Sequence, residues 1–575
     1  MRFKGLFKLS LAASVAVCAN AADESVLSGV EVTSSSGGYG VDDIKISTRN
    51  AGLAKDVMRD IPGVYVGGTN GMNQKIYMRG VSDRGLNITI DGAKQNGNTF
   101  HHNADLLIDP DLIKAIDVEV GSRSVVNGSG ALGGSVAFKT VDAKDLLESG
   151  EKIGAKIKTG YASNNSEFSQ GLMLFTTPVE GLDFIAAINH KGYDYGKSGN
   201  KRKIGGDGND LSYLLKLGYS FLDAHRISIS REHNEFKGLY PLRAEFGSWY
   251  SGSNSVDNRK YERDTTTLKY EYKPSDLLNL DVTAYNTRHQ RVDSSKWGVE
   301  TNGINAKAKS VVESGALTQT FRYGTEFYQS KNFNKPDNHY PEKVNNYSIY
   351  AEDALNFSSL TVTPGIRYTH HELKSYDGRA GNVKSYTYKF NEFTPALALD
   401  YEILKGLHAF ASYARVFRGP DVMESMYASR AKNFEANKDL KATTGNSYET
   451  GLKYHGDINE ASAYSLSAKY FMTKYKNLIV DNNTANGALK RINAGGADIS
   501  GVEQLARINL DALSLAASYT HQNVKYKDRV VNTSTGGYYA SNVICYRDQG
   551  DKYTFNAEYA FSRIDTLIGY NLIYF

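Results

Sequence analysis

The chain has 575 residues, enough for several ordinary domains, yet its 54 glycines and 40 tyrosines are spread along its whole length. Such a composition is typical of repeated β-hairpins rather than of a series of separate globular units. The formal net charge is only +4 and the basic residues do not cluster, so the chain lacks the electrostatic footprint of a nucleic-acid-binding protein. We therefore expect no nucleic-acid partner.

The first 21 residues have the three parts of a secretory signal peptide. A basic start is followed by an apolar run from Leu9 to Val17 and by a small-residue cleavage site at Ala19 to Ala21. Removal of residues 1–21 leaves Cys545 as the one cysteine, as expected for an exported protein without a disulfide framework. No later segment has the ~18 to 20 apolar residues that a membrane-spanning helix needs.

Residues 22–40 are rich in serine and glycine and predict a flexible arm. Within this arm, Val30, Glu31, Val32 and Thr33 form a short strand-like run that can pair with the sheet edge of a partner protein. The alternative interpretation is a disordered terminus with a β-prone patch that arose by chance.

Residues 41–142 differ from everything that follows. The stretch from Met78 to Phe138 has short apolar strands at Ile88 to Ile90 and at Ile116 to Val120, together with Gly-rich turns. A helix is expected over Asp109 to Ile116. The pattern predicts a small α/β unit with its own fold.

Beyond residue 155 the sequence alternates between apolar and polar residues. The alternation is clear in Leu360 to Thr369, in Leu513 to Thr520 and in Tyr553 to Phe561. Ten such residues, at ~3.3 Å each and a tilt near 45°, cover the ~25 Å apolar band of an outer-membrane barrel. Residues 155–575 are therefore predicted to form an all-β transmembrane barrel.

The predicted connections alternate between short and long, as they do in outer-membrane barrels. A secreted sandwich has no reason to sort its loops in this way, and no propeller repeat is evident. About thirteen strands precede the loop at 421–446 and about six follow it, roughly nineteen in all. The short links are 222–224, 274–276 and 403–406, and the long ones are 197–209, 238–259, 331–343, 375–391, 421–446 and 527–550.

Several motifs of the N-terminal unit together resemble the plug domain of the TonB-dependent outer-membrane receptors. The resemblance implies a plug in the lumen of a 22-stranded barrel in the bacterial outer membrane. It also implies that the box at Val30 to Thr33 couples to TonB, the energising inner-membrane protein. The matching residues are Ile61 to Val64, Met78 to Gly80, Ile90 to Gly92, Ile116 with Val118 to Val120, and Gly128 to Gly134.

Within this family the sequence is most similar to the haem and haemoglobin receptors. Asp91 to Gln95, followed by His102 and then by Asp109 to Lys114, follows the plug of those receptors. The resemblance implies that His102 approaches the haem iron, for which a neutral imidazole is a suitable ligand. His101 is adjacent and could take its place. The alternative is a pair of solvated loop histidines.

Two further boxes resemble those of haem receptors imperfectly. Phe417 to Pro420 corresponds to a Phe-Arg-Ala-Pro box and Asn437 to Lys441 to an Asn-Pro-Asn-Leu box. The family places a second iron-ligating histidine between them, where this chain has Asn433. The candidate replacements are Tyr427 as a phenolate, His370 or His371 near a long loop, and Met426 for ferrous haem. For the two histidines the alternative is an exposed strand end.

Taken together, these features predict a receptor that binds haem on the extracellular side and imports it to the periplasm. The expected partners are TonB, haem or a haem-carrying protein, and outer-membrane lipid, and no permanent cofactor is expected. No catalytic constellation is present, so we do not expect an enzyme. The alternatives are a ferric-siderophore receptor that uses loop residues such as Trp249, Tyr250, Arg243 and Tyr427, and a passive porin or adhesin.

The last segment, Asp565 to Phe575, has the pattern of an interrupted strand. Because roughly nineteen strands are counted where the family implies 22, we expect a truncated chain that lacks about three strands.

Overall fold

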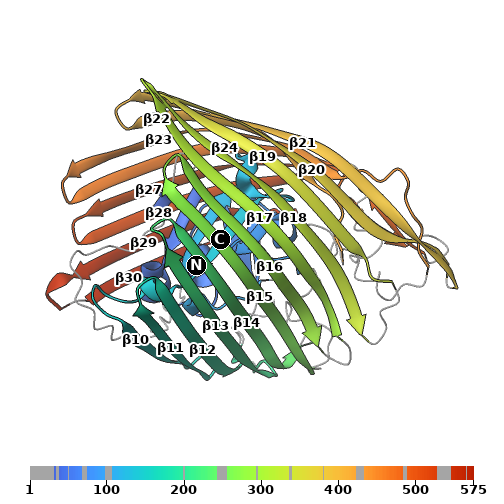
Figure 1. Ribbon diagram of the computed structural model, residues 1–575, viewed down its shortest axis with the longest axis horizontal. Coiled ribbons are helices and arrows are strands. Elements are labelled where there is room, and N and C mark those ends of the chain that lie inside the picture. The colour runs from blue at the N-terminus through green and yellow to red at the C-terminus, as the bar shows by residue number, and fades with distance from the viewer. Residues whose placement is uncertain are drawn as a thin grey trace, which may run out of the picture.

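A small N-terminal unit lies inside a long curved sheet, and Figure 1 shows its blue elements enclosed by the green, yellow and red strands. No helix among the residues described is long and apolar enough to cross a membrane. The computed structural model describes residues 31–33, 38–49, 51–67, 74–97, 106–197, 201, 203–241, 256–292, 296–335, 340–379, 381–422, 433–483, 488–527, 546–564 and 566–575.

Two small sheets build the N-terminal unit. The larger has the strand order β1-β2-β8-β9-β6-β7, in which β6 and β9 run parallel, and the smaller has the order β3-β4-β5. The strands are β1 (Glu31–Thr33), β2 (Gly38–Asp42), β3 (Val64–Gly67), β4 (Lys75–Met78), β5 (Val81–Ser82), β6 (Asn87–Ile90), β7 (Ala93–Lys94), β8 (Ile113–Val120) and β9 (Gly134–Thr140). The helices are α1 (Asp43–Thr48), α2 (Lys55–Met58), and the short 3-10 turns η2 (Asp83–Gly85), η3 (Pro110–Leu112), η4 (Val125–Asn127) and η5 (Ala143–Asp145).

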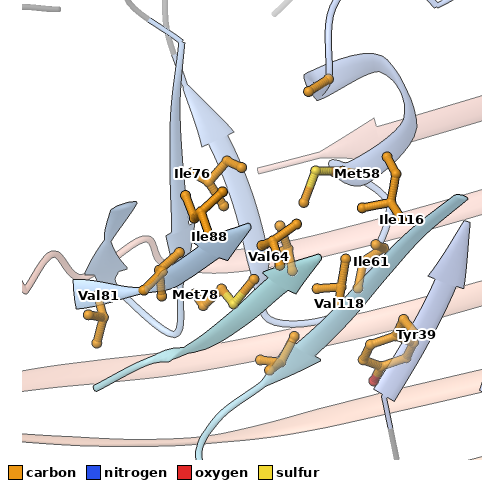
Figure 2. Close-up of a cluster of buried hydrophobic side chains, with 14 of the residues drawn as sticks. Tyr39, Met58, Ile61, Val64, Ile76, Met78, Val81, Ile88, Ile116 and Val118 are labelled. Carbon is orange, nitrogen blue, oxygen red and sulfur yellow. The ribbon is translucent and has the colours of Figure 1, made fainter. Parts of the chain in front are cut away.

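The core of this unit is apolar and closely packed. Figure 2 shows Ile61, Val64, Ile76 and Met78 between the two sheets, and all four are fully buried. Each such side chain contributes roughly 1.5–3 kcal/mol relative to an exposed one. Wall residues such as Phe471 belong to the same cluster, so the plug core continues into the inner face of the surrounding sheet.

The helix predicted over Asp109 to Ile116 is wrong. The Asp109 carboxylate accepts the backbone N–H of Asp111 at 3.1 Å and caps the short turn η3, after which β8 begins at Ile113. Ile116 and Val118 are both buried at a spacing of two residues, and β8 pairs with β9 and β2. The strand ladder therefore outweighs the local helical pattern.

The long sheet has 19 antiparallel strands, with β10 and β30 at the two ends of its order. Thirteen precede the 419–442 connection and six follow it, which confirms the predicted count. A separate hairpin, β25 (Ile479–Asn483) and β26 (Leu489–Asn493), lies in the connection after β24. The 19 strands are β10 (Ile153–Ala162), β11 (Glu167–Val179), β12 (Leu182–Asp194), β13 (Asp207–Phe221), β14 (His225–Pro241), β15 (Val256–Ser275), β16 (Leu278–Val292), β17 (Lys296–Ser314), β18 (Leu317–Lys335), β19 (Lys343–Phe357), β20 (Leu360–Arg379), β21 (Asn382–Leu404), β22 (Leu407–Arg418), β23 (Thr443–Asn459), β24 (Ser462–Lys476), β27 (Gly496–Leu510), β28 (Leu513–Lys527), β29 (Asp551–Phe561) and β30 (Thr566–Tyr574).

The predicted alternation is confirmed where it was clearest. In β20, Ile366 is 50% exposed on the outer face, whereas Arg367 and Thr369 are buried on the inner face. In β29, Tyr553 is exposed and Thr554 is buried. The outer face is therefore apolar and the face toward the plug is polar, as expected of a barrel wall.

The short links predicted at 222–224, 274–276 and 403–406 join successive strands at one rim. The long loop predicted at 375–391 is wrong, because β20 and β21 remain paired up to Arg379 and Asn382. This hairpin projects far beyond the neighbouring strands (Figure 1). Its β-prone aromatic residues explain the difference, since Tyr388 belongs to the same buried apolar cluster as Val422 and Leu440 of the 419–442 connection.

Candidate ligand-binding site

A narrow pocket lies between the plug and the inner wall, where β22 ends. Its volume is about 40 Å³, room for a few water molecules. The described side chains therefore leave no passage of porphyrin size at this point. The residues that shape it are Lys94, Gly97 and Leu106 of the plug, Tyr328 and His371 of the wall, and Arg418, Gly419 and Asp421.

His371 is the histidine of this pocket, on the inner face of β20, where it is 3% exposed. Its Nε2 lies 2.8 Å from the carbonyl oxygen of Pro420, and its Nδ1 lies 3.1 Å from the side-chain nitrogen of Asn346. A carbonyl can only accept, so Nε2 carries the proton and Nδ1 accepts from the amide. A neutral imidazole thus joins the wall to the segment that follows β22.

Gly419 is where the chain departs from the Phe-Arg-Ala-Pro box, and the structure gives a reason. A Cβ atom at this position would lie 2.2 Å from Cδ2 of His371, closer than real Cβ contacts. The imidazole therefore occupies the space that an alanine methyl group would need.

The same contacts reach the Gly-rich turn of the plug. Asn346 donates to the hydroxyl of Ser129 at 3.1 Å as well as to His371. Lys94 donates to the carbonyl of Ser129 at 3.0 Å and to Asn87 at 2.7 Å. The wall, the pocket and the turn thus form one hydrogen-bonded unit.

The pocket holds buried cations. Arg418 lies 3.9 Å from Asp421, and Lys94 is buried beside the ring of Tyr328. Burial lowers the pKa of Lys94, and the attraction of Glu326 and Asp421 offsets this only in part. These cations favour an anionic ligand, because its negative charge would replace part of the solvation that the cations lose on burial.

The other predicted ligands lie outside the described residues. His101 and His102 belong to the gap between Gly97 and Leu106, and Tyr427 and Met426 belong to the gap that follows Val422. Gly97 and Leu106, which border the first gap, and Asp421, one residue before Val422, all line the pocket of His371. Among the residues described, no group of three or more His, Cys, Asp or Glu side chains could hold a metal ion.

His370 and Asn433 are described, and neither faces this pocket. His370 pairs with Tyr347 on the outer face of β20 and its Nδ1 lies 2.8 Å from Asn391 Oδ1. The carbonyl of Asn433 accepts the N–H of Leu489 at 3.0 Å, which ties this segment to β26. The structure thus brings His371, but not His370, to the pocket.

A buried ion-pair cluster between the plug and the wall was missed by sequence reasoning. Arg79 is buried, and its guanidinium donates to Glu503 at 2.8 and 3.2 Å and to Glu449 at 2.6 Å. Lys469 lies 2.8 Å from Glu503, and Arg123 lies 3.3 Å from Glu449. Burial opposes the charge of Arg79, but the two carboxylates raise its net pKa. This cluster fastens the plug to β23 and β27.

The strand-like run of the N-terminal arm lies at the edge of the plug sheet. Glu31–Thr33 pairs with β2, which in turn pairs with β8, and Val30 lies outside the described residues. The sheet order therefore leads from β1 through β8 to β9, which follows the Gly-rich turn.

Comparison with known proteins identifies both parts of the chain. Residues 188–571 match the TonB dependent receptor-like β-barrel, and residues 29–135 match the TonB-dependent receptor plug domain. The chain is 26% identical over 557 residues to heme/hemopexin utilization protein C of Haemophilus influenzae (strain 86-028NP), covering 82% of this chain and 76% of that protein. It is 27% identical over 466 residues to a hemin receptor of Yersinia pestis, covering 75% and 67%.

Two solved structures share the fold. The FrpB iron transporter from Neisseria meningitidis (F3-3 variant) has a TM-score of 0.81 at 20% identity, covering 92% of this chain and 86% of that one. A double mutant of the Serratia marcescens hemophore receptor HasR, in complex with its hemophore HasA and heme, has a TM-score of 0.74 at 17% identity, covering 93% of this chain and 92% of that one. With a barrel match over more than half of its length, the chain belongs to the TonB-dependent receptor family of bacterial outer-membrane transporters, which are not enzymes.

Proposed function

We propose that this receptor binds haem on the extracellular side and imports it to the periplasm. The observation that carries the proposal is the pocket of His371, which is lined by residues bordering both segments with predicted iron ligands. The curated relatives named for heme and hemin support the same ligand. Haem combines an iron that accepts imidazole or phenolate with carboxylates that need cations.

The proposed iron ligand is His102, with His101 as its neighbouring substitute and Tyr427 as the second candidate. His371 is a further candidate, a neutral imidazole whose Nε2 must release the carbonyl of Pro420 before it can bind iron. Arg418 and Lys94 supply positive charge in the same pocket. We leave His370 out because it lies on the outer face.

The proposed division of labour follows the predicted segments. Residues 1–21 direct export, 22–40 form the arm, 41–142 form the plug and 155–575 form the barrel. Val30 to Thr33 act as the handle that TonB captures by adding a strand, a mode that uses backbone hydrogen bonds. The haem arrives free or on a haem-carrying protein, as the hemophore complex of the related fold suggests.

A haemin titration of the purified receptor tests the ligand. We expect a Soret shift that weakens in His102→Ala, with His225→Ala as a control beside a short turn at the start of β14. An unchanged spectrum in a double His101/His102 alanine variant would remove the plug ligands from the proposal. Binding of ferric catecholate without any haemin shift would instead favour a siderophore receptor.

Deletion of residues 30–33 tests the coupling. We expect haem binding to persist and uptake into cells to stop, because the barrel and the pocket are untouched. Undiminished uptake would contradict a TonB-driven transporter and favour a passive barrel.

A further inference from the structure

The outer face of the wall has a hollow across β16 to β21. Its volume is about 540 Å³, far larger than the 40 Å³ pocket beside the plug. It follows two adjacent rows of directly paired residues. One row passes through Ala308, Tyr323 and Ala351, which are paired across β17, β18 and β19. The hollow therefore crosses the strands at right angles.

The lining of this hollow suits a hydrocarbon chain. Alanines form its floor, and Ile349, Ile366 and Phe393 stand around it with half or more of their surfaces exposed. The Thr325 hydroxyl is satisfied by the carbonyl of Ser348 at 3.0 Å. Because this hydroxyl is already bonded, an acyl chain can lie against Thr325 without leaving that polar group unpaired.

The depth of the hollow places it within the membrane. Ile349 lies eight residues before Phe357, where β19 reaches the rim of short turns. At ~3.3 Å per residue and a tilt near 45°, this is ~19 Å from that rim, in the outer half of a ~25 Å apolar band. The occupant therefore comes from the outer leaflet.

A row of lysines lies further out on the same face. In the strand register, Lys331 of β18 lies directly opposite Lys343 of β19, and Lys343 lies directly opposite Lys374 of β20. All three lysines are on the same outward face as Ile349. Neighbouring strands are ~4.8 Å apart, and like charges directly opposite each other are destabilising. Within the described part of the chain, none of these three lysines forms an ion pair.

In another part of the wall, an acidic residue of the chain itself balances the charge of a similar row of lysines. On β24, β27 and β28, Lys474 pairs with Asp498, which pairs with Lys525. There an aspartate separates the two lysines. The lysine row of β18 to β20 has Glu300 of β17 opposite Lys331 at one end, but no acid separates Lys331, Lys343 and Lys374, so an anion from outside would complete the balance of charge.

The two features are spaced like the parts of one lipid. Six residues separate Lys343 from Ile349, ~14 Å along the membrane normal, which puts the lysines just beyond the apolar band. Tyr347 lies between them on the same face, and Tyr368 donates to Asn391 at 2.9 Å on the neighbouring strands. Tyrosines prefer this boundary between apolar and polar layers.

We propose that the outer face of β16 to β21 is a specific site for an anionic glycolipid of the outer leaflet. Its phosphate groups lie on Lys331, Lys343 and Lys374, and one of its acyl chains fills the hollow. The lysine row is ~10 Å across, which suits a headgroup with two phosphates better than one with a single phosphate. The site depends on the barrel and not on the proposed haem ligand.

Titration of the lipid-depleted full chain in detergent, followed by native mass spectrometry, tests the site. The probes are bisphosphorylated lipid A, phosphatidylglycerol and phosphatidylcholine. We expect lipid A to bind best, and its affinity to fall on the order of 100-fold when Lys331, Lys343 and Lys374 are all changed to glutamine. The matched control changes Lys474 and Lys525 to glutamine and should bind as the unmodified chain does.

A second variant tests the hollow without touching the charges. Ala351→Trp fills it from the floor and should weaken lipid A binding while haemin binding is unchanged. The proposal fails if the lysine variant binds lipid A as tightly as the unmodified chain, or if phosphatidylcholine binds equally well. Preference for phosphatidylglycerol over lipid A would also overturn it and assign the face to a phospholipid.

Discussion

Replacing Arg79 with methionine should loosen the plug. Methionine keeps much of the length of the side chain but leaves Glu449 and Glu503 buried without the guanidinium that now lies 2.6 and 2.8 Å away. Removing one partner of a buried ion pair costs roughly 3–5 kcal/mol. Because Lys469 remains 2.8 Å from Glu503, we expect a loss near the lower limit, about 3 kcal/mol. The population of displaced plugs should rise on the order of 100-fold.

Two measurements follow this change. Conductance of single receptors in a planar bilayer should show more frequent openings, and amide hydrogen exchange in β4 and β5 should accelerate. The control is Lys158→Met, since Lys158 lies 2.6 Å from Asp111 in a pair between wall and plug that is partly exposed to solvent. Such a pair contributes at most about 1 kcal/mol.

A compensating variant separates charge from packing. Changing Glu449 and Glu503 to glutamine together with Arg79→Met removes the uncompensated carboxylates and should restore part of the lost anchoring. If the triple variant is as leaky as Arg79→Met, the cost lies in packing against Phe471, over which the guanidinium sits at 4.0 Å. Equal conductance of Arg79→Met and Lys158→Met would refute the role of this cluster.

Three further changes probe other contacts. Gly419→Ala should lower the free energy of unfolding by about 1–3 kcal/mol, because the added methyl group would meet the imidazole of His371. Denaturant unfolding measures this loss, which should disappear in a double variant that also carries His371→Ala. Burial raises the pKa of Asp60, but the combined attraction of Lys45 at 2.9 Å, Arg49 and Lys552 outweighs burial, so the net pKa of Asp60 in the folded chain lies below its usual value. The destabilisation by Asp60→Asn should therefore be complete at pH 7 and shrink below about pH 4, in unfolding curves at both pH values. Lys552→Met should speed hydrogen exchange at the start of β3, because its ammonium donates to three plug carbonyls at 2.6 to 3.1 Å; unchanged exchange would remove that role.

The wall could be predicted from the sequence because each strand has one apolar and one polar face. That period of two residues is local, so it survives without knowledge of the partner strands. It failed where strands continue beyond the membrane, as in the hairpin that joins Arg379 to Asn382. In this hairpin the outer face is no longer apolar, so polar residues such as Lys384 led to the prediction of a loop.

The same period could have separated the two neighbouring histidines. Continued beyond Thr369, it puts His370 on the outer face with Tyr368 and His371 on the inner face with Arg367. The structure has this arrangement. The contact of His371 with Gly419 lay beyond sequence reasoning, because it depends on how the end of β22 bends toward the wall.

The partners of Arg79 show a second limit. Glu449 and Glu503 lie 370 and 424 residues further along the chain. Their strands place them on the inner face, but no local pattern says which plug residue meets them. The motif at Met78 to Gly80 was recognised, yet its electrostatic role needed the three-dimensional arrangement.

The contacts described above connect the ligand pocket to the N-terminal strand through the plug sheet. Pro420 is held by His371, which shares Asn346 with Ser129 of the Gly-rich turn, and that turn leads into β9. From β9 the sheet passes through β8 and β2 to β1, and these strands shorten from eight residues to five and then three. Because shorter ladders hold fewer hydrogen bonds, a pull on β1 breaks the outer pairs before the inner ones. Under the function proposed above, a ligand that takes His371 away from Pro420 would loosen the opposite end of this path, so binding outside and a pull on β1 would act on one hydrogen-bonded structure.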